Sequence, residues 1–134
     1  MKKNILKPSV LAIMASLLAF SAFSHADDKP YTVTDGHALD SETFNGYKLY
    51  RNWCARCHGT VAQGMVGPNL AESLNVISKD EFITTVAKGK MGQIGMMPGW
   101  ESNAQVMEGM DQIYAYLKAR ADGAIGEVKP TKAK

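Results

Sequence analysis

Residues 51–60 read RNWCARCHGT and contain both cysteines of the chain, Cys54 and Cys57, followed at once by His58. Two cysteines separated by two residues and followed by histidine form the pattern to which c-type heme is attached. Each thiol adds to one vinyl group at the porphyrin edge. Two residues between the cysteines let a single turn of chain reach both vinyl groups. The next residue then lies over the heme face, where its imidazole can bind iron. The motif therefore predicts one covalent heme c on Cys54 and Cys57, with His58 as an axial ligand of the iron.

The same cysteine spacing also occurs in zinc sites and in redox dithiols. A zinc site with four protein ligands needs a second pair of Cys or His residues, and this chain has no third cysteine. A thioredoxin-like dithiol lies in a βαβ unit, which the flanking sequence does not predict. The heme interpretation is therefore favoured over both.

Residues 1–26 have the features of a secretory signal peptide. The apolar run within them, from Val10 to Phe23, is shorter than the ~20 residues needed to span a bilayer. We therefore expect cleavage after Ala26, a periplasmic protein, and no membrane anchor after cleavage. The features that define the leader are the basic Lys2, Lys3 and Lys7, the apolar run, and the small–x–small triplet Ser24-His25-Ala26.

Removing residues 1–26 from the 134 leaves 108 residues, enough for a single small domain. The leader holds three of the 15 basic residues and none of the 13 acidic ones. The chain without the leader therefore has 12 basic and 13 acidic residues and a formal charge of −1. The sequence has no stripe of basic residues that could neutralise the phosphates of a nucleic acid, which argues against nucleic acid as a partner. Since a small domain buries only a modest core, a large apolar cofactor would supply much of it. We expect a monomer.

Hydrophobic periodicity and capping residues predict helices within a domain spanning residues 41–123. The first starts with Ser41 as N-cap and runs into the cysteines. It contains Gly46, which suggests close approach of another helix because glycine otherwise weakens a helix. Residues 27–40 are expected to form an extended N-terminal arm, and residues 124–134 a flexible basic tail. Two more helices are predicted, one after the capping box Ser78-Lys79-Asp80-Glu81 and one from about Asn103 to Asp122-Gly123.

The residues GPNL, from Gly67 to Leu70, follow the motif at a distance that suits a supporting turn. A histidine that binds a metal usually donates its other ring N–H to a carbonyl or a carboxylate. The carbonyl of Pro68 is the predicted acceptor for His58.

A methionine sulfur is the expected sixth ligand, since thioether suits reduced iron and a His/Met pair raises the reduction potential. Proline at position 98 stiffens the chain just after Met97, so Met97 is the preferred ligand. In extended chain, neighbouring side chains point to opposite sides, which leaves Met96 as the alternative. Met91 is a weaker candidate. Three others are set aside, Met65 as too close to His58 and Met107 and Met110 as helix-packing residues.

Three further residues are candidates for minor roles. His37 is the other histidine that remains after cleavage, and it is interpreted as a bystander in the N-terminal arm. Trp53 and Trp100 flank the two ligand segments, where they either pack on the porphyrin edge or belong to the ordinary core.

The order of these features resembles class I c-type cytochromes: helix, CxxCH, GPNL, Met-Pro loop and amphipathic C-terminal helix. The resemblance covers about residues 41–121 and implies an all-α fold wrapped around one heme. The stretches TFNGYKLY and IYAYLKARADGAIG are also similar to the cytochrome c-L type. That type accepts electrons from periplasmic PQQ-dependent methanol dehydrogenases.

The resemblance and the motif together predict a one-electron carrier rather than an enzyme. A quinoprotein alcohol or methanol dehydrogenase is the expected donor, and another c-type cytochrome or a terminal oxidase the expected acceptor. Two alternatives remain open: a heme enzyme or gas sensor with a labile sixth ligand, and a subunit permanently docked on a dehydrogenase.

Overall fold

The structure, a computed structural model, describes residues 28–134, so the predicted signal peptide lies outside the described residues. The described part is mainly helical, which confirms the all-α prediction, and none of its helices is long and apolar enough to cross a membrane. Its helices are α1 (Ser41–Trp53), α2 (Ala55–His58), α3 (Leu70–Ser73), α4 (Lys79–Lys88), α5 (Ala104–Glu108) and α6 (Met110–Ala121). Its short strands are β1 (Val33–Thr34), β2 (Ala38–Leu39), β3 (Lys90–Met91), β4 (Met96–Met97) and β5 (Thr131–Lys132).

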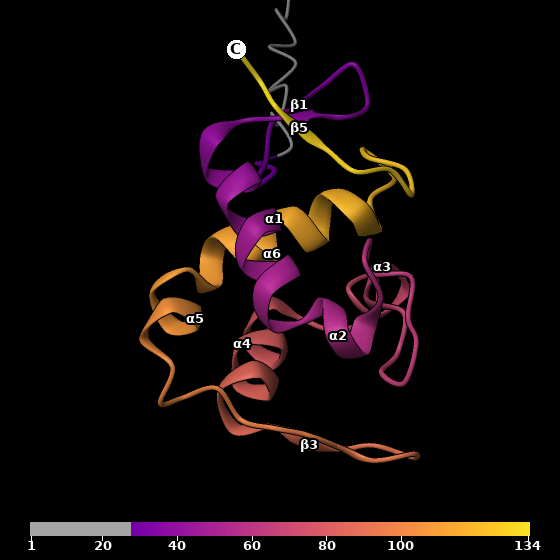
Figure 1. The fold of residues 1–134 in the computed structure, drawn as a ribbon, viewed down its shortest axis with the longest axis vertical. Helices are drawn as coiled ribbons and strands as arrows, with labels where there is room; N and C mark the ends of the chain where they lie inside the picture. Colours follow the sequence, from indigo (N-terminus) through magenta and orange to yellow (C-terminus); the bar gives the residue numbers. More distant parts are fainter. Residues whose placement is uncertain (1–27) are drawn as a thin grey trace, which may run out of the picture.

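Helices α1 and α6 cross at the centre of the molecule (Figure 1). At the crossing, a Cβ added to Gly46 would lie 1.8 Å from the backbone oxygen of Gln112. Only a residue without a side chain permits this approach of the two backbones. Beside it, Asn45 Nδ2 donates to Gln112 Oε1 over 2.5 Å. The glycine within the predicted first helix therefore marks a helix crossing, as expected.

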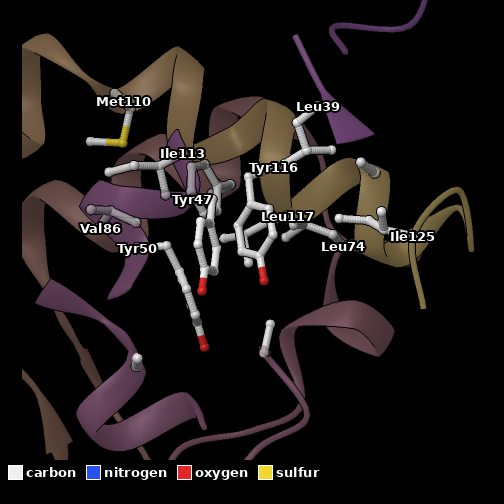
Figure 2. Close-up of a cluster of buried hydrophobic side chains, with 14 of the residues drawn as sticks. Leu39, Tyr47, Tyr50, Leu74, Val86, Met110, Ile113, Tyr116, Leu117 and Ile125 are labelled. Atoms are coloured by element: carbon white, nitrogen blue, oxygen red, sulfur yellow. The ribbon is translucent and has the colours of Figure 1, made fainter. Parts of the chain in front are cut away.

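The facing sides of these two helices contribute to the core, which also draws on β2, α4 and the loops (Figure 2). The ring of Tyr116 lies 5.3 Å from the ring of Tyr47 and 5.3 Å from that of Tyr50, measured between centroids. Such tilted and edge-on contacts are favourable arrangements of aromatic rings. Figure 2 shows all three hydroxyl groups pointing to the same side of the core. That side is the one on which the chain continues from α1 into α2.

Capping groups define the helix starts, with one shift from the prediction. The first N-cap is Asp40 rather than Ser41, and its carboxylate accepts from the N–H groups of Glu42 and Thr43. Asp40 and Ser41 are both good N-caps, and the carboxylate of Asp40 also accepts from Thr32 N–H, 2.7 Å away in the arm. Ser78 caps α4 as predicted, with its hydroxyl accepting from the N–H of Glu81.

The predicted C-terminal helix is divided in two at Gly109. A Cβ at this position would lie 2.1 Å from Leu49 Cδ1, a side chain of α1. The turn between α5 and α6 therefore gives space to a residue of the crossing helix. The periodicity of the sequence continues through this break, so the pattern alone predicted one helix.

Residues 124–134, predicted to be a flexible tail, form an ordered segment. Strand β5 pairs in parallel with β2 of the N-terminal arm, where Thr131 N–H donates to His37 O over 2.9 Å. Ile125 anchors the segment, with only 1% of its surface exposed. The pairing joins two segments about ninety residues apart, which no local pattern indicates.

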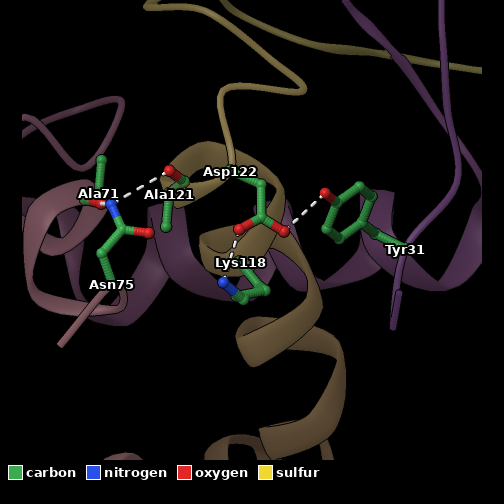
Figure 3. A network of polar contacts seen from close by, with 6 residues as sticks. All are labelled: Tyr31, Ala71, Asn75, Lys118, Ala121 and Asp122. Carbon is green, nitrogen blue, oxygen red and sulfur yellow. Dashed lines mark hydrogen bonds and ion pairs between the residues drawn. The ribbon is translucent and has the colours of Figure 1, made fainter. Parts of the chain in front are cut away.

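A polar network ties the end of α6 to its surroundings (Figure 3). Asp122 accepts from Tyr31 Oη over 2.8 Å and from Lys118 Nζ over 2.5 Å. Asn75 Nδ2 donates to the backbone oxygen of Ala121 over 3.3 Å. Burial alone would raise the pKa of the Asp122 carboxyl, but the hydrogen bonds from Lys118 and Tyr31 hold it below its usual value.

We predict that Gly46→Ala lowers the free energy of unfolding by at least ~3 kcal/mol, the upper range for overpacking, because the new methyl group meets backbone. Denaturant titration of the purified protein measures the change. Gly126→Ala is the matched control: nothing lies within 4 Å of its added Cβ, and we expect a change within ~0.5 kcal/mol. Equal stabilities of the two variants would contradict the close helix crossing.

Candidate functional site

The CxxCH motif folds as one helical turn attached to the end of α1. Cys54 is the C-cap of α1, and its N–H donates to Tyr50 O over 2.9 Å. The N–H groups of Cys57 and His58 both donate to Cys54 O over 3.1 Å. Neither cysteine is in a disulfide; Cys54 is half-buried and Cys57 is exposed. The two thiols are thus presented from a single turn, as the spacing predicted.

The environment of Cys54 argues against a reactive dithiol. Burial, with a smaller contribution from the Cys57 thiol, raises the pKa of Cys54 to about 12. Catalytic and metal-binding cysteines instead have lowered pKa values, because the thiolate is the reactive form. Within residues 28–134, no group of three or more His, Cys, Asp or Glu side chains is placed to hold a metal ion.

His58 is buried, and its ring is oriented by the loop that follows it. Its Nδ1 lies 2.9 Å from the carbonyl oxygen of Pro68, which is the contact predicted from GPNL. A Cβ added to Gly67 would lie 2.7 Å from Cε1 and 2.8 Å from Nδ1 of His58. The backbone at Gly67 therefore lies close against the imidazole and limits its rotation.

Hydrogen bonds from α1 and α2 hold this loop. The hydroxyl of Tyr50 donates to the carbonyl of Gly59, directly after the motif. Gly67 N–H donates to Cys57 O over 2.8 Å, which folds the far end of the loop back onto α2. Burial raises the pKa of Tyr50 strongly, so this phenol stays protonated and remains a donor.

The structure separates the candidate methionines by their exposure. Met97 in β4 is partly buried and packs against the core cluster, whereas Met96 and Met91 are 68% and 74% exposed. Met96 and Met91 face each other as cross-strand partners. Met110 is buried in the core, which agrees with the packing role predicted for it.

Trp53 and Trp100 bring together the two segments predicted to supply iron ligands. Their rings meet edge to face with centroids 5.5 Å apart. Trp53 directly precedes Cys54, and Trp100 follows Met97 by three residues. Trp100 N–H also donates to Val86 O over 2.9 Å, which fixes its loop on α4. The sequence placed each tryptophan beside a ligand segment but did not indicate that the two touch.

Two buried polar atoms of the described residues have no hydrogen-bond partner, Trp53 Nε1 and the hydroxyl of Tyr116. Buried donors without an acceptor are costly and rare. Both lie on elements around the motif, and a bound group with carboxylate oxygens would satisfy them. Heme has two propionate groups, so these atoms, the two thiols and the oriented imidazole fit it.

Comparison with known proteins agrees with this fit. The profile of a family described as cytochrome c oxidase, cbb3-type, subunit III, matches residues 42–117. Cytochrome c-555 of Methylococcus capsulatus is 35% identical over 92% of this chain and 89% of its own length. This chain belongs to the c-type cytochrome family. Cytochrome c-553I of Paracoccus denitrificans is 33% identical over 80% of this chain and 50% of its own length.

A solved structure extends the likeness to the fold. The crystal structure of the c-type cytochrome XoxG from Methylobacterium extorquens AM1 matches with a TM-score of 0.71 at 35% identity. The match covers 78% of this chain and 66% of that one. The predicted class I cytochrome c fold is confirmed.

Membership in the family also settles the cofactor and the class of activity. This cytochrome carries covalent heme c and is an electron-transfer protein rather than an enzyme, as predicted. When bound, the heme supplies an iron that alternates between the ferrous and ferric states. The residues that fit its covalent attachment are Cys54 and Cys57.

We predict that Gly67→Ala displaces the His58 ring, because its methyl group would occupy the space next to Cε1 and Nδ1. The fraction of exported protein that carries heme should fall. The melting temperature of the heme-loaded protein should also drop by several degrees, since a loss of 1 kcal/mol in the free energy of unfolding lowers it by ~4–8 °C in a domain of this size. Heme absorbance per polypeptide and thermal unfolding provide the readouts. Gly95→Ala is the control: nothing lies within 4 Å of its added Cβ, so it should match the wild type. A Gly67→Ala protein that also matches the wild type would refute the contact between Gly67 and the His58 ring.

Proposed function

We propose that this cytochrome is a periplasmic one-electron carrier whose iron is bound by His58 and Met97. The observation that carries the proposal is the geometry at His58. The bond of its Nδ1 to Pro68 O leaves the other ring nitrogen free of that contact and available for iron. The buried ring and its fixed orientation are what a permanent axial ligand requires.

Met97 is the favoured sixth ligand for two reasons. It is partly buried against the core, whereas its neighbour Met96 points outward and is 68% exposed. It also precedes Pro98, and the Trp53–Trp100 contact links its segment to the heme-binding turn. A thioether held in a stiff turn suits a weak ligand that must stay bound in both oxidation states.

We further propose that the electron donor is a PQQ-dependent methanol or alcohol dehydrogenase. The resemblance of TFNGYKLY and IYAYLKARADGAIG to the cytochrome c-L type supports this partner. The acceptor is another c-type cytochrome or a terminal oxidase. The leader-like residues 1–26 support export to the periplasm, where such dehydrogenases act.

We predict that Met97→Ala removes the weak far-red absorption band that methionine-ligated ferric heme shows, and that it opens the iron to carbon monoxide. The reduction potential should fall, because a His/Met pair raises it. Met96→Ala is the matched control and should keep the band and exclude carbon monoxide. The reverse outcome would assign the ligand to Met96. A wild type that lacks the band and binds carbon monoxide readily would favour the enzyme or sensor alternative.

We predict that a purified PQQ-dependent methanol dehydrogenase reduces this cytochrome at least ~10-fold faster than it reduces an unrelated c-type cytochrome of similar potential. Among related complexes, association rates differ by one to three decades, so this difference is measurable by stopped-flow absorbance. Equal rates for the two cytochromes would remove the dehydrogenase assignment and leave the electron carrier intact.

A further inference from the structure

Arg120 in α6 is a buried cation held by backbone carbonyl groups. Only 7% of its surface is exposed. Its Nε donates to Val61 O over 2.7 Å, and its Nη1 donates to Ile125 O over 2.8 Å. Among residues 28–134, no carboxylate forms an ion pair with it. Buried charges are normally paired because desolvation is costly, so this arginine calls for a functional explanation.

One partner of Arg120 lies in the loop that orients His58. Val61 follows His58 by three residues, between the motif and Pro68. The next residue, Ala62, is fully buried with φ at +65°, a strained conformation for a residue with a side chain. Ala62 O accepts from Leu70 N–H over 2.9 Å, which closes the loop just beyond Pro68.

Arg120 and Tyr50 therefore secure the first half of this loop from two helices. Tyr50 of α1 binds the carbonyl of Gly59, and Arg120 of α6 binds the carbonyl of Val61. The loop runs from these anchors to the Pro68 carbonyl, which accepts from the imidazole. The orientation of His58 thus depends on a side chain near the end of α6.

The charge of Arg120 also acts within the interior. Burial raises the pKa values of Tyr50 and Tyr116, and the guanidinium opposes this increase at both phenols. A guanidinium keeps its charge in proteins, and a charge in a low-dielectric interior acts over a longer range than one in water. A fixed positive charge disfavours ferric iron relative to ferrous iron, since the ferric state carries one more positive charge.

We propose that Arg120 is a positioning residue for His58 whose fixed buried charge raises the reduction potential of the heme. The proposal rests on the proposed binding of iron by His58. In this arrangement one side chain couples the C-terminal segment, through Ile125 O, to the loop that orients the axial imidazole.

The test compares the reduction potentials of heme-loaded wild type, Arg120→Gln, Arg120→Lys and Lys48→Gln. We expect Arg120→Gln to lower the equilibrium constant for reduction at least ~3-fold, or ~28 mV at 59 mV per tenfold for one electron. Arg120→Lys keeps a positive charge but lacks the planar guanidinium that binds both carbonyls, so it should lower this constant less than Arg120→Gln does. Lys48→Gln removes the same charge from an exposed position on α1 and should remain within about twofold of wild type, because water screens it.

Two outcomes of this comparison overturn the proposal. One is an Arg120→Gln potential within about twofold of wild type. The other is an equal shift in Arg120→Lys and Arg120→Gln, which would show that the charge has no effect.

NMR of the wild type tests the proposal even if Arg120→Gln fails to fold. The Nε–H of Arg120 should exchange slowly with solvent and change its chemical shift between the ferrous and ferric protein. Fast exchange, or identical shifts in the two states, overturns the proposal.

The spectrum of the wild type separates this proposal from the one on which it rests. If the His and Met ligand signals are absent, the proposed ligation fails. If they are present and the Arg120→Gln potential is unchanged, only the role of Arg120 fails.

Discussion

The crossing of α1 and α6 at Gly46 is the constraint on which the rest of this cytochrome depends. The absence of a side chain at Gly46 lets the two backbones approach until Gln112 O occupies the space of a Cβ. With the backbones this close, Tyr50 packs directly on Tyr116. One turn beyond Tyr50 lies Cys54, the C-cap of α1. The crossing therefore sets where the heme-binding turn leaves the core.

From this crossing, each helix contributes one anchor to the loop that supports His58, the proposed axial ligand. The Tyr50 hydroxyl and the Arg120 guanidinium both donate to carbonyl groups of the loop between His58 and Pro68. Backbone carbonyls are suited to this purpose because each has two lone pairs and must be satisfied when buried. An electron carrier gains from such rigidity, because an iron site that keeps its geometry in both oxidation states has little to rearrange.

The segment that holds the proposed methionine ligand is organised differently, by a short hairpin rather than by a helix crossing. Strands β3 and β4 pair so that Met91 and Met96 are solvent-exposed cross-strand partners. The adjacent Met97 packs against the core. Alternation along a strand is the reason: neighbouring side chains point to opposite sides, so Met96 is exposed and Met97 is partly buried. The contact of Trp53 with Trp100 then joins this segment to the heme-binding turn.

The sequence by itself determined the features whose physics is local. The CxxCH spacing, the cap at Ser78, the glycine in the first helix and the position of the Pro68 carbonyl beside His58 all depend on residues within a turn or a short loop. The tertiary structure alone decided the break at Gly109, the pairing of β5 with β2, the contact of Trp53 with Trp100 and the carbonyl partners of Arg120. Each of these joins residues far apart in the chain, or depends on a side chain of another helix, and neither periodicity nor propensity contains that information.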